Sequence, residues 1–266
     1  MVTQERPVKP RLAATCVVLR DGPTGPQVLM VERSRDIVFG GGALVFPGGK
    51  LDHGDQYKIG GRYLRNARAL PHITRALAIA AVREVFEETG ILLTRSHSAK
   101  RPAHNRRRAK LAQQWRERLA KDRCDMDAFF RAAGHYLDFR DIAYYARWIT
   151  PQGMVKRYDT HFFLARAPQG QIPTHDGWEL VSAHWLTPLE ALQLEQDKQV
   201  KLMFPTRMNL RRLAKMPSVH AAFSMMRTES IVPVLPQLEK VEGRVMARIP
   251  RNAGYGTAGL VDRVAL

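Results

Sequence analysis

Cysteine is nearly absent from this chain, which has two in 266 residues. Cys16 lies in an apolar run and Cys124 in a charged stretch, so the sequence offers neither a disulfide framework nor the spacing of a zinc site. No run of 18 apolar residues occurs, so we expect no membrane span. The first eleven residues lack the apolar centre of a secretory signal, and the last three are not Ser-Lys-Leu. We therefore expect a protein of the reducing cytoplasm.

Acidic residues are also scarce, with 25 Asp and Glu against 42 Lys and Arg and a net charge of +17. The excess is uneven: residues 56–75 contain five basic residues and no acid, and residues 95–131 contain twelve basic and four acidic residues. A positive field of this kind raises the local concentration of polyanionic substrates. The alternative is that these charges are solvated surface.

Three of the acids gather in residues 83–91, with the sequence R-E-V-F-E-E-T-G-I. On a helix, Glu84, Glu87 and Glu88 fall at i, i+3 and i+4 and share one narrow face, while apolar residues occupy the opposite face. Like charges at this spacing destabilise a helix by roughly 0.3 kcal/mol per pair, and a hard divalent cation with oxygen ligands offsets that cost. The helix therefore indicates a metal site, and the alternative is an amphipathic helix with a solvated acidic face.

The same stretch resembles the Nudix box, G-x5-E-x7-R-E-U-x-E-E-x-G-U with U aliphatic. Residues 83–91 match its second half at every specified position, and Gly49 with Asp55 resembles its first half. The chain departs from the pattern in having Asp at position 55 and 27 residues, in place of 7, between Asp55 and Arg83. The chain is identified as a member of the Nudix hydrolase superfamily with an insertion inside its box.

The resemblance implies a pyrophosphohydrolase that uses Mg²⁺ or Mn²⁺. Glu84, Glu87 and Glu88 would hold the metal together with the carbonyl of Gly48, and one of these glutamates would take a proton from the attacking water. Glu179, in a late strand pattern, is a further candidate for a base or a metal ligand.

The resemblance also implies two structural and binding roles for basic residues. Arg83, counted with the catalytic residues, would pair with Asp55 and tie the loop to the helix. Arg33, which ends a strand pattern before the residues 46–49, F-P-G-G, would bind substrate together with Gly49, as the coenzyme A diphosphatase signature suggests. Arg157 would also bind substrate, because residues 157–164 resemble a segment of the acyl-coenzyme A diphosphatase branch.

The expected fold is α/β (α+β), the Nudix fold, with a mixed curved sheet sandwiched between helices. Residues 11–19 and 27–32 predict an antiparallel strand pair, and residues 144–149, 158–165 and 179–186 predict further strands. Thr187 and Pro188 begin a helix, and residues 207–212 and 218–228 predict extra C-terminal helices. Thr74 is a candidate cap for the box helix. Helices are also expected over residues 110–120 and 127–133.

We expect one Nudix domain over residues 1–238, with insertions at about 56–75 and 95–141, and a tail over 239–266. The first insertion reads as a loop with one turn near residues 62–69, and residues 95–108 read as a mobile loop. Both insertions are basic and flank the box helix in sequence.

The expected substrate is a small diphosphate, most of all coenzyme A or acyl-coenzyme A, cleaved to 3′,5′-ADP and 4′-phosphopantetheine or its acyl form. The resemblance to that branch rests on the interrupted box, on residues 157–164 and on the Pro-rich run near Val232. The alternatives are another capped diphosphate, such as a dinucleotide or an RNA 5′ end, and a non-catalytic Nudix scaffold that binds nucleic acid. The basic helix pattern with Trp115 is the feature that favours nucleic acid, which is not the preferred partner.

Overall fold

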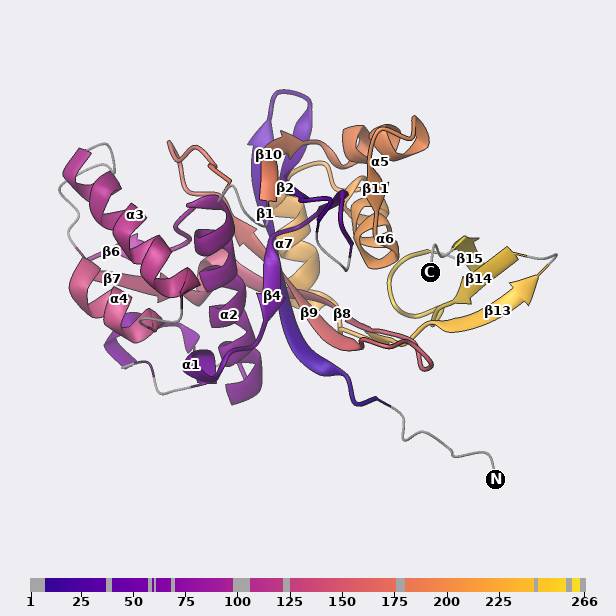
Figure 1. Ribbon diagram of the computed structural model, residues 1–266, viewed down its shortest axis with the longest axis horizontal. Helices are drawn as coiled ribbons and strands as arrows, with labels where there is room; N and C mark the ends of the chain where they lie inside the picture. Colours follow the sequence, from indigo (N-terminus) through magenta and orange to yellow (C-terminus); the bar gives the residue numbers. More distant parts are fainter. Residues whose placement is uncertain are drawn as a thin grey trace.

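A mixed β-sheet between two layers of helices forms the body of the protein (Figure 1). The computed structural model describes residues 8–36, 40–56, 59, 61–67, 70–97, 106–121, 125–175, 180–241, 244–256 and 260–263. Helices α2, α3 and α4 lie on one side of the sheet, and α5, α6 and α7 lie on the other. The predicted mixed sheet between helices is therefore confirmed. Among the described residues, no helix combines the length and apolar character needed to cross a membrane.

The main sheet contains nine strands in the order β11-β3-β2-β1-β9-β8-β12, with β10 paired to β2 and β4 paired to β1. Its strands are β1 Arg11–Gly22, β2 Gly25–Arg33, β3 Ala43–Val45, β4 Gly48–Lys50, β8 Ile142–Ile149, β9 Tyr158–Arg166, β10 Leu180–Leu186, β11 Lys201–Leu202 and β12 Pro233–Val234. As expected, β1 and β2 are antiparallel. β1 pairs with β2 only over its last residues, and β4 takes the place beside residues 13–15. This exchange of partners brings the diglycine of the box into the sheet.

Helix α2 (His72–Thr89) carries the box and packs its apolar face on the sheet. Val82, Val85 and Phe86 are buried there, as the periodicity predicts. The helix ends at Gly90, whose φ of 69° places it in the left-handed region and whose N–H bonds to the carbonyl of Phe86. Its N-terminus differs from the expectation. The helix begins at His72, two residues before Thr74, and the N-cap position is Pro71, without a side-chain cap.

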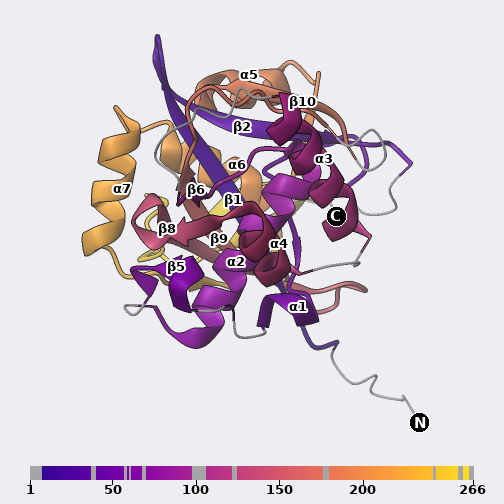
Figure 2. The ribbon, with the colours of Figure 1, turned by 90° about the vertical axis from the view of Figure 1, so that its left-hand side faces the viewer.

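The two insertions pack against each other on the outer side of α2. Helix α1 (His53–Gln56) leads into the first insertion, and the elements of the two insertions are η1 Gly61–Tyr63, β5 Leu64–Arg65, β6 Arg95–Ser96, α3 Arg106–Ala120, α4 Met126–Ala133, β7 His135–Asp138 and η3 Phe139–Asp141. Strand β7 pairs with β5 on one edge and β6 on the other. The turn expected near residues 62–69 begins as η1 and continues as β5, whereas the expected mobile loop over 95–108 begins as β6 and ends in the first turn of α3. Figure 2 shows α3 and α4 in front of α2. We call residues 56–75 and 95–141 together the insertion lobe.

The opposite side of the sheet carries α5 Pro188–Gln196, α6 Phe204–Leu213 and α7 Val219–Thr228, followed by the hairpin strands β13 Gln237–Val241, β14 Arg244–Arg248 and β15 Leu260–Arg263. Thr187 caps α5 in a capping box with Glu190, as its sequence predicts. Residues of the expected tail, among them Ala247, Ile249 and Tyr255, are buried in the core of this side. The segment after Leu238 therefore adds to the folded core.

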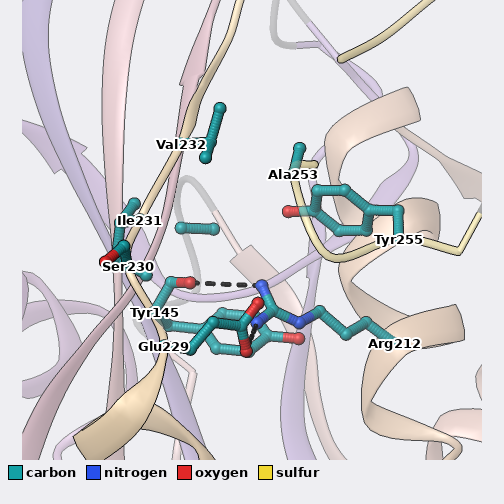
Figure 3. Close-up of a pocket in the computed structure, with 9 residues that line it drawn as sticks. Tyr145, Arg212, Glu229, Ser230, Ile231, Val232, Ala253 and Tyr255 are labelled. Atoms are coloured by element: carbon teal, nitrogen blue, oxygen red, sulfur yellow. Dashed lines mark hydrogen bonds and ion pairs between the residues drawn. The ribbon is translucent and has the colours of Figure 1, made fainter. Parts of the chain in front are cut away.

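A set of buried polar and aromatic side chains lies under this C-terminal segment (Figure 3). Arg212 is 5% exposed, lies 4.8 Å from the ring of Tyr145 and 5.6 Å from the ring of Tyr255, and pairs with Glu229 at 2.5 Å. The Tyr255 hydroxyl donates to Asn209 and accepts from the indole of Trp148, both at 2.8 Å. We call Tyr145, Trp148, Asn209, Arg212, Glu229 and Tyr255 the C-terminal cluster.

Candidate active site

The diglycine bend lies directly against the box helix. Gly48 and Gly49 pair with Thr15 and Ala14 of β1. A Cβ on Gly48 would lie 2.5 Å from the carbonyl oxygen of Ala14, and a Cβ on Gly49 would lie 2.2 Å from Oε1 of Glu84. Both positions therefore require glycine, the first to keep the strand pairing and the second to admit a carboxylate.

Two of the three predicted glutamates face this bend. The backbone N–H of Gly48 donates to Oε2 of Glu88 at 3.0 Å, and Glu84 lies against Gly49. A glycine loop and a helix that are far apart in the sequence thus meet, as the resemblance implies. The backbone of the diglycine bend and the carboxylate oxygens of Glu84 and Glu88 are in direct contact here, with no side chain between them.

Arg83 organises the remaining acids. It is 7% exposed and forms two parallel bonds of 3.0 Å to the carboxylate of Asp55. Its Nη1 donates to both oxygens of Glu87 at 3.1 Å, and its Nη2 donates to the carbonyl of Lys50 at 3.1 Å. The ion pair between Arg83 and Asp55 is thus present despite the shorter acid and the long insertion, because the short helix α1 carries Asp55 to the guanidinium.

The charges around Arg83 do not balance. The carboxylates of Asp52, Asp55, Glu84 and Glu87 lie within 3.0–3.2 Å of this single guanidinium. Burial, partly opposed by Arg83, raises the pKa of Glu84 to about 7, and burial also raises the pKa of Glu87. We call these five residues and Glu88 the box cluster. Its surplus of negative charge indicates a site that binds a cation.

The donor set fits a hard divalent cation, which prefers carboxylate and carbonyl oxygen. The side chains do not yet converge: within the described residues, no three His, Cys, Asp or Glu side chains are arranged to hold a metal. Glu87 is held by Arg83, whereas Glu84 and Glu88 face the diglycine bend. Binding by all three glutamates would therefore require Glu87 to exchange its contact with Arg83 for one with the cation.

The other predicted site residues have separate places. Arg33 ends β2, and its Nε is buried without a hydrogen-bond partner in the described part of the chain. Arg157 is 8% exposed and donates to the backbone carbonyls of Thr150 and Val8 at 3.1 and 2.7 Å. These bonds tie Arg157 to the residue after β8 and to the segment before β1, and its predicted substrate contact stays a prediction. Glu179 lies outside the described residues.

One contact at this site was missed from the sequence. Arg116 of α3 is 6% exposed and donates to the backbone carbonyls of Glu87 and Glu88 at 2.7 and 2.8 Å. In the sequence, Arg116 is one of twelve basic residues between positions 95 and 131, and its neighbours give it no distinguishing pattern. What distinguishes Arg116 from the other basic residues is the packing of α3 on α2, which brings its guanidinium to the end of the box helix.

Comparison with known proteins agrees with this geometry. The domain family described as NUDT19 Nudix domain matches residues 62–213. Human acyl-coenzyme A diphosphatase NUDT19 is 33% identical over 156 residues, covering 54% of this chain and 40% of the human protein. The protein of the same name from Gallus gallus is 26% identical over 247 residues, covering 75% and 64% of the two chains. The chain thus spans less than two thirds of the length of these two relatives.

A solved structure resembles the whole body of the protein. The NUDIX hydrolase from Alicyclobacillus acidocaldarius superposes with a TM-score of 0.71 and 30% identity, covering 81% of this chain and 96% of that one. The domain match covers more than half of the chain, and it includes the second half of the box and most of the insertion lobe. The chain belongs to the Nudix hydrolase family and carries a Nudix domain of the NUDT19 type.

Proposed function

We propose that the protein hydrolyses the diphosphate bond of coenzyme A or acyl-coenzyme A, giving 3′,5′-ADP and 4′-phosphopantetheine or its acyl form. The observation that carries the hydrolase proposal is the box cluster, in which four carboxylates surround one arginine beside a glycine bend. A site with this surplus of negative charge is unfavourable until a cation joins it.

Nudix hydrolases generally use divalent metal ions, and we propose Mg²⁺ or Mn²⁺ here. Glu84, Glu87, Glu88 and the carbonyl of Gly48 would hold the ion. When bound, such an ion neutralises charge on the phosphate oxygens and lowers the pKa of a coordinated water. The missing side chain at Gly49 lets Glu84 approach the bend, and one of the three glutamates accepts the proton released by the attacking water.

The remaining residues of the box cluster hold these carboxylates in place. Arg83 fixes Glu87 through one nitrogen and Asp55 through two others. Asp55 is 3% exposed, and its Oδ2 also accepts the backbone N–H of Asp52, so the arginine cannot turn without breaking several bonds. We propose that this rigidity keeps the glutamates oriented between turnovers.

The choice of coenzyme A rests on the relatives and on two features of this chain. The curated relatives from human and Gallus gallus are named acyl-coenzyme A diphosphatase. Coenzyme A carries a 3′-phosphate besides its diphosphate, and the insertion lobe is strongly basic. Arg33 adds a buried Nε–H that lacks an acceptor among the described residues and that a phosphate oxygen would satisfy.

The structure weakens the case for nucleic acid. Trp115, the aromatic residue of the basic helix pattern, is 8% exposed and packs edge-on against Phe129 at 5.9 Å. Its ring is therefore not offered for stacking on a base. Another capped diphosphate remains the second candidate, because the box cluster contacts only the part of a substrate that all such compounds share.

The test is a panel of coenzyme A, an acyl-coenzyme A, NADH, ADP-ribose and capped RNA, assayed with Mg²⁺ or Mn²⁺. We expect the coenzyme A compounds to be cleaved fastest, and Glu87→Gln to lower kcat by about 10²- to 10⁴-fold. Glu195→Gln is the matched control, because Glu195 also pairs with an arginine, Arg207, but on the opposite side of the sheet. Faster cleavage of NADH or ADP-ribose would show that coenzyme A is not the preferred substrate. Metal-independent binding of RNA without turnover would show that the protein is a nucleic-acid-binding protein and not an enzyme.

A further inference from the structure

The box helix ends with carbonyl groups that it cannot satisfy itself. The last four carbonyls of any α-helix lack the usual N–H four residues further along the chain. In α2, Gly90 N–H reaches the carbonyl of Phe86, and the hydroxyl of Thr89 reaches the carbonyl of Val85 at 2.6 Å. The carbonyls of Glu87, Glu88 and Thr89 are satisfied from outside the helix.

Arg116 supplies two of these three partners. Its Nε donates to Glu87 and its Nη2 to Glu88, the two residues whose side chains complete the box cluster. Two further bonds reach Thr174, from Nη1 to the hydroxyl at 3.0 Å and from Nη2 to the carbonyl at 2.9 Å. The N–H of Thr174 in turn donates to the carbonyl of Thr89 at 2.8 Å.

The same contact joins three parts of the chain. Arg116 belongs to the insertion lobe, Glu87 and Glu88 to the box, and Thr174 to the connection between β9 and β10. That connection is held to the residues after α2 a second time, because the side-chain amide of Gln171 bonds to both the N–H and the carbonyl of Leu92, at 2.7 and 3.2 Å. Gly90 leaves room for the junction: a Cβ there would lie 3.1 Å from the Thr174 hydroxyl and 3.4 Å from Nη1 of Arg116.

Electrostatics favours a guanidinium at this point. The C-terminus of a helix carries about half a negative charge, and a cation placed there is stabilised most when it is partly buried. The guanidinium of Arg116 lies at this end of α2, donating to the backbone carbonyls of Glu87, Glu88 and Thr174 and to the hydroxyl of Thr174. A planar group with five donors can satisfy several carbonyls at once, which lysine cannot do.

We infer that Arg116 is a positioning residue of the active site, through which the insertion lobe holds the last turn of α2 and with it the side chains of Glu87 and Glu88. This inference rests on the proposed metal-dependent function. Without the guanidinium, two carbonyls beneath the lobe would lose their partners, and the last turn of the helix would open. The cation site would then be formed only part of the time.

The test compares Arg116→Met with Arg118→Met, a control from the same helix whose exposed guanidinium lies over the ring of Trp115 at 4.4 Å. Mn²⁺ binding is measured directly by titration without substrate, next to kcat and KM. Residues that orient metal ligands typically contribute 10- to 100-fold to metal affinity or activity. We expect Arg116→Met to weaken Mn²⁺ binding and to lower kcat by about that factor, with KM unchanged, and we expect Arg118→Met to keep the wild-type affinity for Mn²⁺.

A second variant covers the case in which Arg116→Met does not fold. Arg116→Lys keeps the charge but cannot bridge both carbonyls, so we expect intermediate Mn²⁺ affinity and faster amide hydrogen exchange at residues 89–91. Wild-type Mn²⁺ affinity in either folded variant would overturn the inference. The titration needs no substrate, so it stays decisive even if coenzyme A proves not to be the substrate.

Discussion

Two of the buried arginines, Arg83 and Arg212, lie on opposite sides of the sheet and have opposite surroundings. Arg83 in the box cluster faces four carboxylates, whereas Arg212 in the C-terminal cluster faces one carboxylate, two aromatic rings and a backbone carbonyl at 3.4 Å. In the second arrangement one carboxylate balances one guanidinium, and the indole of Trp148 donates to the Tyr255 hydroxyl beside them. A buried arginine therefore does not by itself mark a functional site. The sign and size of the uncompensated charge around it make that distinction.

The strongest way to test this comparison is to remove each arginine in turn. Arg83→Met would leave Asp55, which is 3% exposed, and its neighbouring acids without a counter-charge, and we expect a loss of about 4 kcal/mol in the free energy of unfolding. Arg212→Met would leave only Glu229, whose side chain is 29% exposed and can hydrate, and we expect about 1 kcal/mol. Denaturant unfolding measures both values. Equal losses would contradict the distinction.

The surplus of acids also predicts a pH effect in protein stripped of metal by a chelator. Burial raises the pKa of Glu84 from an ordinary value of 4.5 to about 7. Between these values the folded state keeps a proton that the unfolded state has released, so stability should fall as pH rises from about 4.5 to 7, by about 3 kcal/mol at most. Glu84→Gln should flatten this slope, and Glu229→Gln should leave it intact. A flat profile in the wild-type chain would argue against the crowding of charge.

Adding the cation should reverse that loss. At a Mn²⁺ concentration about 100 times its Kd, a ligand that binds only the folded state adds about 2.7 kcal/mol. Thermal unfolding should show this gain in the wild-type chain and in Arg212→Met, because the C-terminal cluster takes no part in binding. In Glu87→Gln the gain should be much smaller. A gain of the same size in all three proteins would place the cation elsewhere.

The smallest expected effect on stability comes from a substitution in the C-terminal cluster. Tyr255→Phe removes one hydroxyl that accepts from Trp148 and donates to Asn209. We expect a loss of about 1 kcal/mol in the free energy of unfolding and an unchanged kcat. A drop in kcat would show that the two sides of the sheet are coupled.

Local patterns in the sequence are sufficient for much of the fold. The apolar runs of β1 and β2, the capping residues of α5 and the spacing of Glu84, Glu87 and Glu88 each act over a few residues, and the structure agrees with them. The start of α2 is harder to predict from the sequence. Thr74 is a residue type that often caps helices, but the helix already begins at His72.

Long-range contacts decide what local patterns cannot. The pair between Asp55 and Arg83 was expected only from the family resemblance, and it forms across a long insertion because α1 folds back on α2. Arg157 resembles a substrate residue by its neighbours, and no local pattern indicates the bond that its guanidinium also forms to the backbone of Val8, which lies 149 positions away. Such pairings depend on which elements become neighbours, and a pattern of one residue type cannot encode that choice.

The pairing of strand β7 limits how the insertion lobe can be deleted or transferred to another protein. It is hydrogen-bonded to β5 from the first insertion and to β6 from the start of the second, while Tyr63 stacks on Phe130 at 6.1 Å between them. Deleting either insertion would leave the other without a strand partner and without the aromatic contact between Tyr63 and Phe130. A chimera that transfers this lobe to a smaller relative must therefore include both segments, although helix α2 separates them in the sequence.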